Sequence, residues 1–403
     1  MEQFNNTTPA PDILLQTEAA NAVPNTTIDT GPPTSDEIET AIKKLKNNRA
    51  PGICGIKAEL LKYGGNAIVT WLLTLFTLVW ERCSIPADWT LAIILPLWKG
   101  KGSKSDCTKY RGISLLSVPA KVFAHICLSR IKTLLLQKQR PQQSGFTPCR
   151  STLDRIISLR LLAERRIEYR EPLFAAYIDL KAAFDSLDRE SLWNILKIIG
   201  TPQKIIDIIT MLYTSTKSMV RVNGSLTEPF TISSGVRQGC VLAANLFNTA
   251  TDRILYRTTQ TLSFGATFSD SHEPITDLDY ADDVVLLAEL FDTLKDAVLI
   301  FSRESSKLGL HINWSKTMLQ SLSPWLSIPQ QSIIGPQTVE TTNNFTYLGC
   351  TISHNNSCND DIKRRIAIAT STMSKLSSVW RSPRLSLKTK LRLYDALIIL
   401  ILE

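Results

Sequence analysis

The sequence of 403 residues predicts a fold of class α+β, and three kinds of pattern lead to this prediction. Apolar residues recur at helical spacing in several long segments, which indicates amphipathic helices. Two other regions are typical of β-hairpins, and one of them surrounds the turn signal Asn223-Gly224. Two short apolar runs have the pattern of buried strands, and an aspartate follows each of them. A chain that mixes helices and hairpins in this way belongs to class α+β.

Start, stop and turn residues set the limits of the individual elements. Thr34 and Glu37 have the spacing of a capping box, so a helix is expected to begin there and to run through Lys46. Further helices are expected over 58–63, 67–82, 118–139, 151–169, 189–199, 202–213, 240–258 and 291–307. Strands are expected over 91–98, 173–178, 219–222, 228–232, 275–278 and 284–288, and near 310–320 and 345–352.

The composition is that of an ordinary globular protein and excludes several other classes. Hydrophobic residues make up 44% and charged residues 20%, which excludes a mostly disordered chain, a collagen and a coiled coil. The longest apolar run, 67–80, is shorter than the roughly 20 residues that span a bilayer, so no membrane is expected as a partner. No apolar signal segment follows Met1. Eight cysteines without a CxxC pair favour a reducing, intracellular compartment.

Charge is distributed unevenly along the chain. The net charge is +8, but residues 1–34 contain four acids and no base, so the rest of the chain carries +12. The first 34 residues also hold five of the 19 prolines, which predicts a flexible leader. Between 362 and 392 there are nine basic residues and no acid. A strip of one sign attracts polyanions, and this favours nucleic acid over a merely solvated helix face.

Three carboxylates stand where the apolar strands end. Asp179 follows one buried run, and Asp282 and Asp283 lie in the turn of the second hairpin. A carboxylate beside buried strands is costly unless it is paired or binds a cation. Oxygen ligands of this type suit Mg²⁺, and two such ions about 3.5–4 Å apart can promote phosphoryl transfer. Taken alone, an Asp-Asp pair in a turn is more often turn chemistry than catalysis.

Further motifs, taken together with these acids, resemble a known family. In chain order they are Ala50-Pro51-Gly52 with Ala58-Glu59-Leu60-Leu61, Tyr110-Arg111-Gly112-Ile113-Ser114-Leu115-Leu116, Ser144-Gly145-Phe146 with Arg150-Ser151-Thr152, Tyr177-Ile178-Asp179-Leu180-Lys181-Ala182-Ala183-Phe184-Asp185, Ser234-Gly235-Val236-Arg237-Gln238-Gly239-Cys240-Val241-Leu242, Tyr280-Ala281-Asp282-Asp283, and Asn313-x-x-Lys316-Thr317 with Tyr347-Leu348-Gly349. From about residue 47 to 380 the chain resembles the reverse transcriptases of non-LTR (LINE-type) retrotransposons. The ordered set is far more specific than any one motif.

The resemblance implies a right-hand polymerase whose palm contains a ferredoxin-like antiparallel sheet. The expected parts are a flexible leader (1–34), an N-terminal extension and fingers (35–172), a palm (173–353, with part of the fingers between about 186 and 235) and a partial, truncated thumb (354–403). The implied activity is RNA-directed DNA polymerisation, in which a dNTP is joined to a primer 3′-hydroxyl. The implied partners are an RNA template, a DNA primer and dNTPs.

The family also implies a metal and a compartment. Two Mg²⁺ ions are expected, with Mn²⁺ as a substitute. The family acts in the nucleus, but the cluster Lys363-Arg364-Arg365 is too short to identify a nuclear signal, so the cytoplasm stays open. The sequence carries no signal for the oligomeric state.

The resemblance assigns roles to the acids and to one aromatic residue. Asp179 and Asp282 would bridge both metal ions, and Asp283 would support them from the second arm of the hairpin. Phe184 matches the aromatic gate under the nucleotide sugar, where a ring would clash with a ribose 2′-hydroxyl and favour dNTPs. The other interpretation of Phe184 is a core aromatic.

Five further residues match positions that contact the substrates. Gln238 and Gly239 match the motif beside the templating base pair. Arg111 and Lys99 match cations of the fingers that hold the triphosphate. Lys316 matches a lysine that gives a proton to the pyrophosphate. A surface ion pair for Arg111 and a solvated lysine for Lys316 are the alternative interpretations.

The chain departs from the family pattern at positions that are not metal ligands. These positions are Cys54, Thr147, Cys149, Ala243 and Ala244. Family members usually carry an endonuclease upstream, whereas this sequence has a short leader there and ends inside the expected thumb. The alternative function is therefore a catalytically decayed or domesticated fragment that only binds nucleic acid. An RNA replicase is disfavoured, because such enzymes carry Gly-Asp-Asp where this chain has Ala281-Asp282-Asp283.

Overall fold

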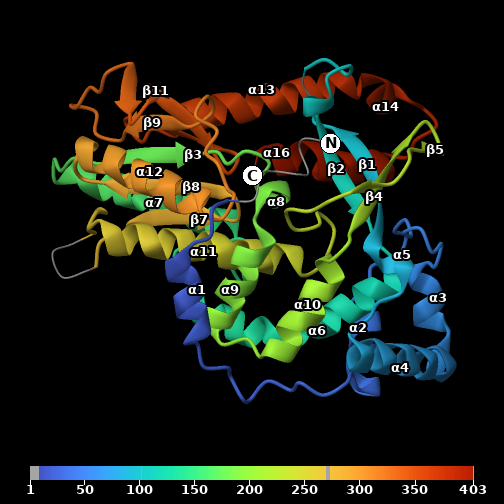
Figure 1. Ribbon diagram of the computed structural model, residues 1–403. Helices are drawn as coiled ribbons and strands as arrows, with labels where there is room; N and C mark the ends of the chain where they lie inside the picture. Colours follow the sequence, from blue (N-terminus) through green and yellow to red (C-terminus); the bar gives the residue numbers. More distant parts are fainter. Residues whose placement is uncertain (1–8, 101, 269–272, 403) are drawn as a thin grey trace.

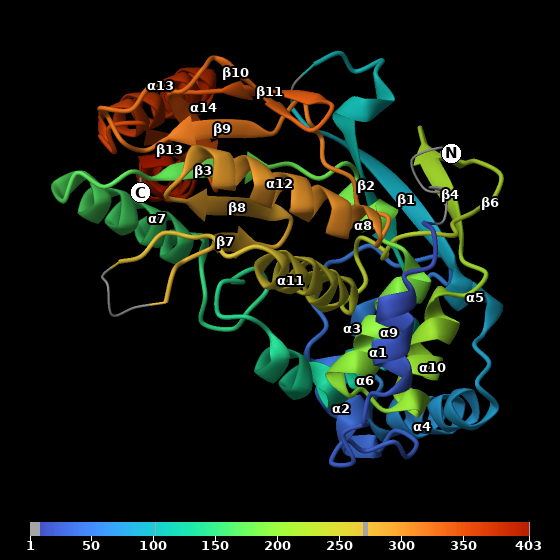
Figure 2. The same ribbon diagram turned by 60° about the vertical axis from the view of Figure 1, so that its left-hand side comes forward.

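The computed structural model describes residues 9–100, 102–268 and 273–402, and it combines helices with β-sheets as class α+β requires (Figure 1, Figure 2). The helices are α1 (Ile13–Ala20), α2 (Ser35–Lys43), α3 (Ala58–Tyr63), α4 (Gly65–Arg82), α5 (Ala87–Thr90), α6 (Val118–Lys138), α7 (Thr152–Glu168), α8 (Ala183–Ser186), α9 (Arg189–Ile199), α10 (Gln203–Tyr213), α11 (Ala243–Thr261), α12 (Phe291–Ser306), α13 (Asn359–Lys375), α14 (Ser377–Arg381), α15 (Leu387–Tyr394) and α16 (Leu400–Leu402). The strands are β1 (Leu91–Trp98), β2 (Tyr110–Leu115), β3 (Phe174–Ile178), β4 (Lys217–Val222), β5 (Ser225–Leu226), β6 (Phe230–Thr231), β7 (Asp277–Tyr280), β8 (Asp283–Ala288), β9 (Met318–Ser321), β10 (Gln331–Ile334), β11 (Gln337–Thr341), β12 (Asn344–Tyr347) and β13 (Cys350–Ser353).

A six-stranded sheet with the order β10-β11-β9-β3-β8-β7 forms the centre of one half of the molecule. Its middle strand, β3, pairs antiparallel with β8 on one side and with β9 on the other. Ala176 lies opposite Leu286 in β8 and opposite Leu319 in β9. In Figure 2, α12 lies across β3 and β8.

Both faces of β3 are buried, which explains its unbroken apolar sequence. Ala176 and Ile178 belong to a large core that includes α12, whereas Ala175 and Tyr177 belong to a second core that includes α7. Successive residues of a strand point to opposite faces, so two helices on opposite sides of the sheet cover the two sets. A strand that is covered on both faces reads as a continuous hydrophobic run.

The other half of the molecule combines a smaller sheet with a group of helices. Its sheet has the order β2-β1-β4-β5, with β6 also paired to β4. Beneath it, helices pack around Phe76, Trp80, Trp89 and Phe123, whose ring centroids lie 5.2–5.9 Å apart in tilted and edge-on pairs. Such geometries are the favoured ones for aromatic rings and add to the burial of their large apolar surface.

Most of the expected elements are present, and their ends differ by a few residues. The capping box of Thr34 and Glu37 is confirmed, and α2 follows it. The turn at Asn223-Gly224 joins β4 to β5, as its sequence predicts. The sequence analysis did not predict β2 or the β10–β11 hairpin. These strands are short and partly exposed, and the alternation of apolar and polar residues along them is weak.

The expectation of a flexible leader over 1–34 is wrong for the residues around α1. Asp12 caps this helix by accepting a hydrogen bond from the Leu15 N–H at 3.2 Å, and its other oxygen pairs with Arg257 of α11. Glu18 pairs with Arg253, also on α11, and Leu15 is 1% exposed. A buried apolar side chain and paired acids thus offset the entropy of ordering a segment whose composition suggests disorder.

No helix among the described residues is both long and apolar enough to cross a bilayer. The expected boundaries at 34/35, 172/173 and 353/354 stay a prediction.

Replacing Leu15 with alanine tests whether α1 belongs to the folded unit. The variant is expected to lose about 2–4 kcal/mol of unfolding free energy, because a buried leucine leaves a cavity. The control Ile13→Ala removes a side chain that is 76% exposed and is expected to change stability by less than about 0.5 kcal/mol. Urea unfolding followed by circular dichroism measures both, and equal effects would contradict the docking of α1.

Candidate active site

The three carboxylates predicted from the sequence lie at one end of the strands of the six-stranded sheet, where β3 ends and β8 begins. The last residue of β3, Ile178, is paired with Val284 of β8. Asp179 comes next in the chain, so the antiparallel register places it opposite Asp283, the first residue of β8. Asp282 lies in the tight turn that joins β7 to β8. The fold therefore brings together acids that are about 100 positions apart in the sequence.

Burial, together with neighbouring charges, raises the pKa of the two acids in the turn, Asp282 and Asp283. Desolvation by the surrounding protein, and then the charges of Asp282 and Asp179, raise the pKa of Asp283 from 3.8 to about 6. Desolvation, with a further contribution from Asp179, also raises the pKa of Asp282, and Arg111 opposes both shifts. Asp282 and Asp283 are nevertheless open to solvent on one side. Like charges held together in this way are stabilised by a bound cation.

Asp179 is held by the segment that follows α12. Its Oδ2 accepts a hydrogen bond from Asn313 Nδ2 at 2.9 Å and forms an ion pair with Lys316 Nζ at 3.3 Å. The Asn313 N–H donates to the Asp179 carbonyl at 2.7 Å, and the Asp179 N–H donates to Thr317 Oγ1 at 3.3 Å. Sequence reasoning identified Lys316 but assigned no role to Asn313, because an uncharged amide gives no electrostatic signal.

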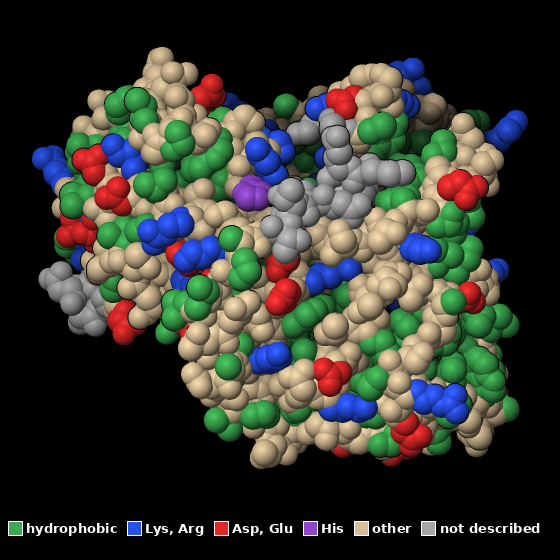
Figure 3. Space-filling view, viewed as in Figure 1, with side chains coloured by type: hydrophobic (Ala, Val, Ile, Leu, Met, Phe, Trp, Pro, Cys, Tyr) green, Lys and Arg blue, Asp and Glu red, His purple; other side chains and the backbone are tan. Residues whose placement is uncertain are grey.

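Arg111 and Lys99 lie on the hairpin formed by β1 and β2. Arg111 is paired with Leu97, and the ladder continues where the Lys99 N–H donates to the Lys109 carbonyl at 2.8 Å. Alternation along the strands therefore places Lys99 and Arg111 on the same face of the hairpin. Figure 3 shows acidic and basic side chains close together near the centre of this face of the molecule. The positive charge of Arg111 acts to lower the pKa values of Asp282 and Asp283, which belong to the other sheet.

Gln238 and Gly239 pack against β2. The Gln238 carbonyl accepts a hydrogen bond from the Ser114 N–H at 3.0 Å. Gly239 has a φ of +113°, and a Cβ on it would lie 2.5 Å from the Ser114 carbonyl oxygen. Glycine is required here by the approach of protein backbone. The expected position beside a templating base pair stays a prediction.

Phe184 lies on α8, five residues beyond Asp179. Its ring stacks on Phe247 of α11, with centroids 4.4 Å apart and planes inclined by 17°. The Phe184 side chain is half-buried, so Phe247 supports one side of the ring while part of it stays accessible. This position is compatible with a gate as well as with a core aromatic.

The donor chemistry of the carboxylates fits Mg²⁺, although the side chains do not form a finished metal site. Carboxylate oxygens are the ligands that this ion prefers. Across the described ranges, no group of three or more His, Cys, Asp or Glu side chains is arranged to hold an ion. Lys316 also engages one oxygen of Asp179. An ion bound at that oxygen would displace Lys316 from it.

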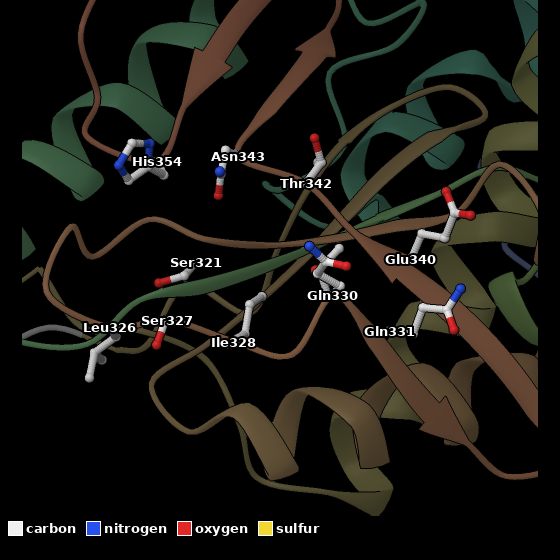
Figure 4. Close-up of a pocket in the computed structure, with 11 residues that line it drawn as sticks. Ser321, Leu326, Ser327, Ile328, Gln330, Gln331, Glu340, Thr342, Asn343 and His354 are labelled. Carbon is white, nitrogen blue, oxygen red and sulfur yellow. The ribbon is translucent and has the colours of Figure 1, made fainter.

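A polar cavity of about 620 Å³ lies elsewhere on the same sheet (Figure 4). Its lining includes Ser321, Gln330, Glu340 and His354. Ser321 is paired with Phe174, the first residue of β3, whereas Asp179 follows the last one. The length of β3 thus separates this cavity from the carboxylates, and the cavity is not part of the candidate active site.

Comparison with known proteins agrees with this geometry. Residues 101–352 match the family described as reverse transcriptase (RNA-dependent DNA polymerase). The chain is 27% identical over 286 residues to the transposon TX1 uncharacterized 149 kDa protein of Xenopus laevis, a match that covers 71% of this chain and 22% of that protein. It is 25% identical over 327 residues to the retrovirus-related Pol polyprotein from type-1 retrotransposable element R2 of Popillia japonica, covering 78% and 44%. It is 26% identical over 266 residues to the RNA-directed DNA polymerase from mobile element jockey of Drosophila melanogaster, covering 64% and 27%.

The family match covers more than half of the chain, and the chain belongs to the reverse transcriptase family. Within that family its relatives are proteins of non-LTR retrotransposons. The chain spans 22% to 44% of the length of the three relatives named above.

The raised pKa of Asp283 gives a direct test of the site geometry. Replacing Asp179 with asparagine removes one of the charges that raise this pKa, so its value should fall below about 6. A carboxyl ¹³C NMR titration measures the change, and Asp292→Asn, at an 88% exposed position on α12, serves as control. If the titration of Asp283 is unchanged in the Asp179 variant, the two carboxylates do not interact and the site geometry is contradicted.

The same shift predicts how stability depends on pH. The folded protein holds the proton of Asp283 more tightly than the unfolded chain does, so the contribution of this group to stability falls as pH rises from about 4 to about 6. Asp283→Asn should remove this part of the pH dependence of the unfolding free energy. Denaturation series at several pH values measure it, and an unchanged pH dependence counts against the shift.

Proposed function

We propose that this chain is the RNA-directed DNA polymerase part of a non-LTR retrotransposon protein, which extends a DNA primer on an RNA template by using dNTPs. The observation that carries this proposal is the strand register, which sets Asp179 opposite Asp283 with Asp282 in the adjacent turn. Membership of the reverse transcriptase family supplies the reaction class.

The proposed reaction is nucleotidyl transfer at a pair of Mg²⁺ ions, with Mn²⁺ as a substitute, held by Asp179, Asp282 and Asp283. When bound, such ions lower the pKa of the primer 3′-hydroxyl and neutralise the triphosphate. Lys316, which forms an ion pair with Asp179, is proposed to donate a proton to the pyrophosphate oxygen. Arg111 neutralises part of the acidic charge and, with Lys99 on the same hairpin face, binds the triphosphate.

The remaining assigned residues orient the substrates. Gln238 and Gly239 sit beside β2 and are proposed to contact the templating base pair. The Phe184 ring, supported by Phe247, is proposed to lie under the sugar of the incoming nucleotide.

In the proposed right-hand architecture, each half of the molecule takes one role. The six-stranded sheet with α11 and α12 is the palm, built on a ferredoxin-like antiparallel core of β3, β7, β8 and β9. The sheet containing β1 and β2 belongs to the fingers, and α13–α16 belong to the thumb.

The basic strip of residues 362–392 is proposed to hold the template and primer backbone. Six of its nine cations have exposed side chains: Lys363, Lys375, Arg381, Arg384, Lys388 and Arg392. Two others, Arg364 and Arg365, pair with Asp361 at 2.8 and 2.7 Å and so fix the start of α13. Contacts of this kind bind phosphates without reading the sequence.

The alternative is a decayed or domesticated fragment that only binds nucleic acid. The basic strip alone would serve that function. Retention of all three carboxylates, in a register that brings them together, favours catalysis.

Primer extension tests the proposed activity. The full chain should extend oligo(dT) on poly(rA) with dTTP and Mg²⁺, and Asp282→Ala should lower the rate about 100-fold or more, because a metal ligand is lost. Asp292→Ala, at an exposed position on α12, should keep the rate. No extension by any of the three proteins, with RNA binding retained, would favour the alternative function.

Sugar discrimination tests the gate. Phe184→Ala should raise the use of UTP relative to dTTP by about 10- to 100-fold, because a steric block is removed. Phe247→Leu, which weakens the supporting ring, should lower the temperature of unfolding more than it changes the ratio. A loss of stability in the Phe184 variant without any change in the ratio of UTP to dTTP use would identify a core aromatic.

A further inference from the structure

Gln143 lies against the turn that carries Asp282 and has no part in the mechanism above. It is 2% exposed and belongs to residues 139–146, the first part of the connection from α6 to α7, which are called the bracing segment below. Its side-chain Oε1 accepts two backbone hydrogen bonds, from the Gly145 N–H at 2.7 Å and from the Ala281 N–H at 3.0 Å. Ala281 directly precedes Asp282, so one side-chain atom fixes the start of the acidic turn.

Ala281 needs this support because its backbone conformation is unfavourable. Its φ is +59°, in the left-handed region where a Cβ is disfavoured. Two-residue hairpin turns with a positive φ at the first position normally use glycine there. Ala281 is also buried, and an N–H that is removed from water requires an acceptor. Gln143 supplies that acceptor.

The bracing segment is itself fixed to three other elements. The Ser144 N–H donates to the Asp279 carbonyl of β7 at 3.0 Å, and Arg155 Nε of α7 donates to Ser144 Oγ at 2.6 Å. Asn248 of α11 donates to the Gly145 carbonyl. The segment that carries Gln143 is thus held by β7, α7 and α11 as well as by its contact with the turn.

Gly145 makes the close approach to the turn possible. A Cβ on Gly145 would lie 2.2 Å from the Ala281 nitrogen, closer than any real contact. Any side chain at this position would push the bracing segment and the turn apart. Gly145 and Gln143 therefore contribute to one contact, the first by leaving space and the second by accepting the hydrogen bond.

We propose that Gln143 is a positioning residue that holds the Ala281–Asp283 turn, and thereby both of its carboxylates, in the geometry needed for catalysis. This inference rests on the proposed polymerase function. Gln143 acts through the turn and does not touch the substrate. Within the described part of the chain, its amide Nε2 has no hydrogen-bond partner, so the acceptor oxygen is the atom that matters.

Two substitutions at Gln143 and one matched control separate positioning from general stability. Gln143→Met keeps the length of the side chain but removes the acceptor, whereas Gln143→Glu keeps an acceptor oxygen. The control is Gln320→Met, because Gln320 is fully buried and bonds to Tyr177, Asn343 and Ile352 without contacting the turn. All three are made in the protein used for primer extension.

Steady-state primer extension and amide hydrogen exchange are the two readouts. Gln143→Met should lower kcat about 10- to 100-fold, the usual cost of losing a partner that orients a metal ligand, while KM for the template–primer stays within about 3-fold. Exchange over residues 278–285 should become faster in this variant. The Gln143→Glu variant should have a kcat within about 3-fold of that of the parent protein. Gln320→Met should lower the temperature of unfolding but keep both kcat and the exchange of the turn.

Three results would overturn the inference. One is a Gln143→Met protein with the parent kcat, and another is failure of Gln143→Glu to recover activity although it folds. The third is loss of kcat in the Gln143 and Gln320 variants in proportion to their stability. If the parent protein extends no primer, the proposed function fails by itself and exchange decides the inference. Faster exchange of the turn in Gln143→Met but not in Gln320→Met supports it, and equal exchange overturns it.

Discussion

The register between β3 and β8 is fixed from both faces of the sheet, and the candidate active site depends on it. Side chains alternate along a strand, so a slip of one residue would turn Ile178 and Tyr177 toward the wrong cores and move Asp179 away from Asp283. The core with α12 and the core with α7 both oppose such a slip. Hydrophobic burial along the strands therefore sets the separation of charges at their ends.

In the half of the molecule that contains β1 and β2, two half-buried arginines hold separate backbone segments together. Arg189 donates to the carbonyls of Tyr213, Ser234 and Gly235, and Arg237 donates to those of Trp89 and Thr90. Burial lowers the pKa of Arg189 to about 10, yet its hydrogen bonds go to neutral carbonyls. These arginines join the segment of Gln238 and Gly239 to the sheet that carries Arg111. The cations facing the acids are therefore placed by the fold, and their position does not require substrate.

Residues with an unusual charge or spacing can be recognised from the sequence, whereas residues that act through uncharged contacts cannot. Asp179 and the Asp282–Asp283 pair could be predicted, because a carboxylate beside a buried apolar strand is costly unless it is paired or binds a cation. The roles of Asn313, which is half-buried, and of the buried Gln143 could not, since an uncharged amide gives no signal until its partners are known. The sequence did not predict that α1 is an ordered helix, because the acids that hold it pair with arginines more than 230 positions away in the chain. Gly239 was expected beside a templating base pair, which stays a prediction, and the close approach that the structure shows at this residue is to protein backbone.

The ion pair between Lys316 and Asp179 has a consequence for the proposed metal site. The Lys316 ammonium group is a counter-ion of the Asp179 carboxylate, so binding of a divalent ion there would be an exchange of cations and not an addition to bare carboxylates. The pair is exposed, and such pairs contribute about 0.2–1 kcal/mol, so this competition would weaken metal affinity only several-fold. A displaced Lys316 would stay tethered near the phosphates of a bound nucleotide, where the proposed mechanism needs a proton donor.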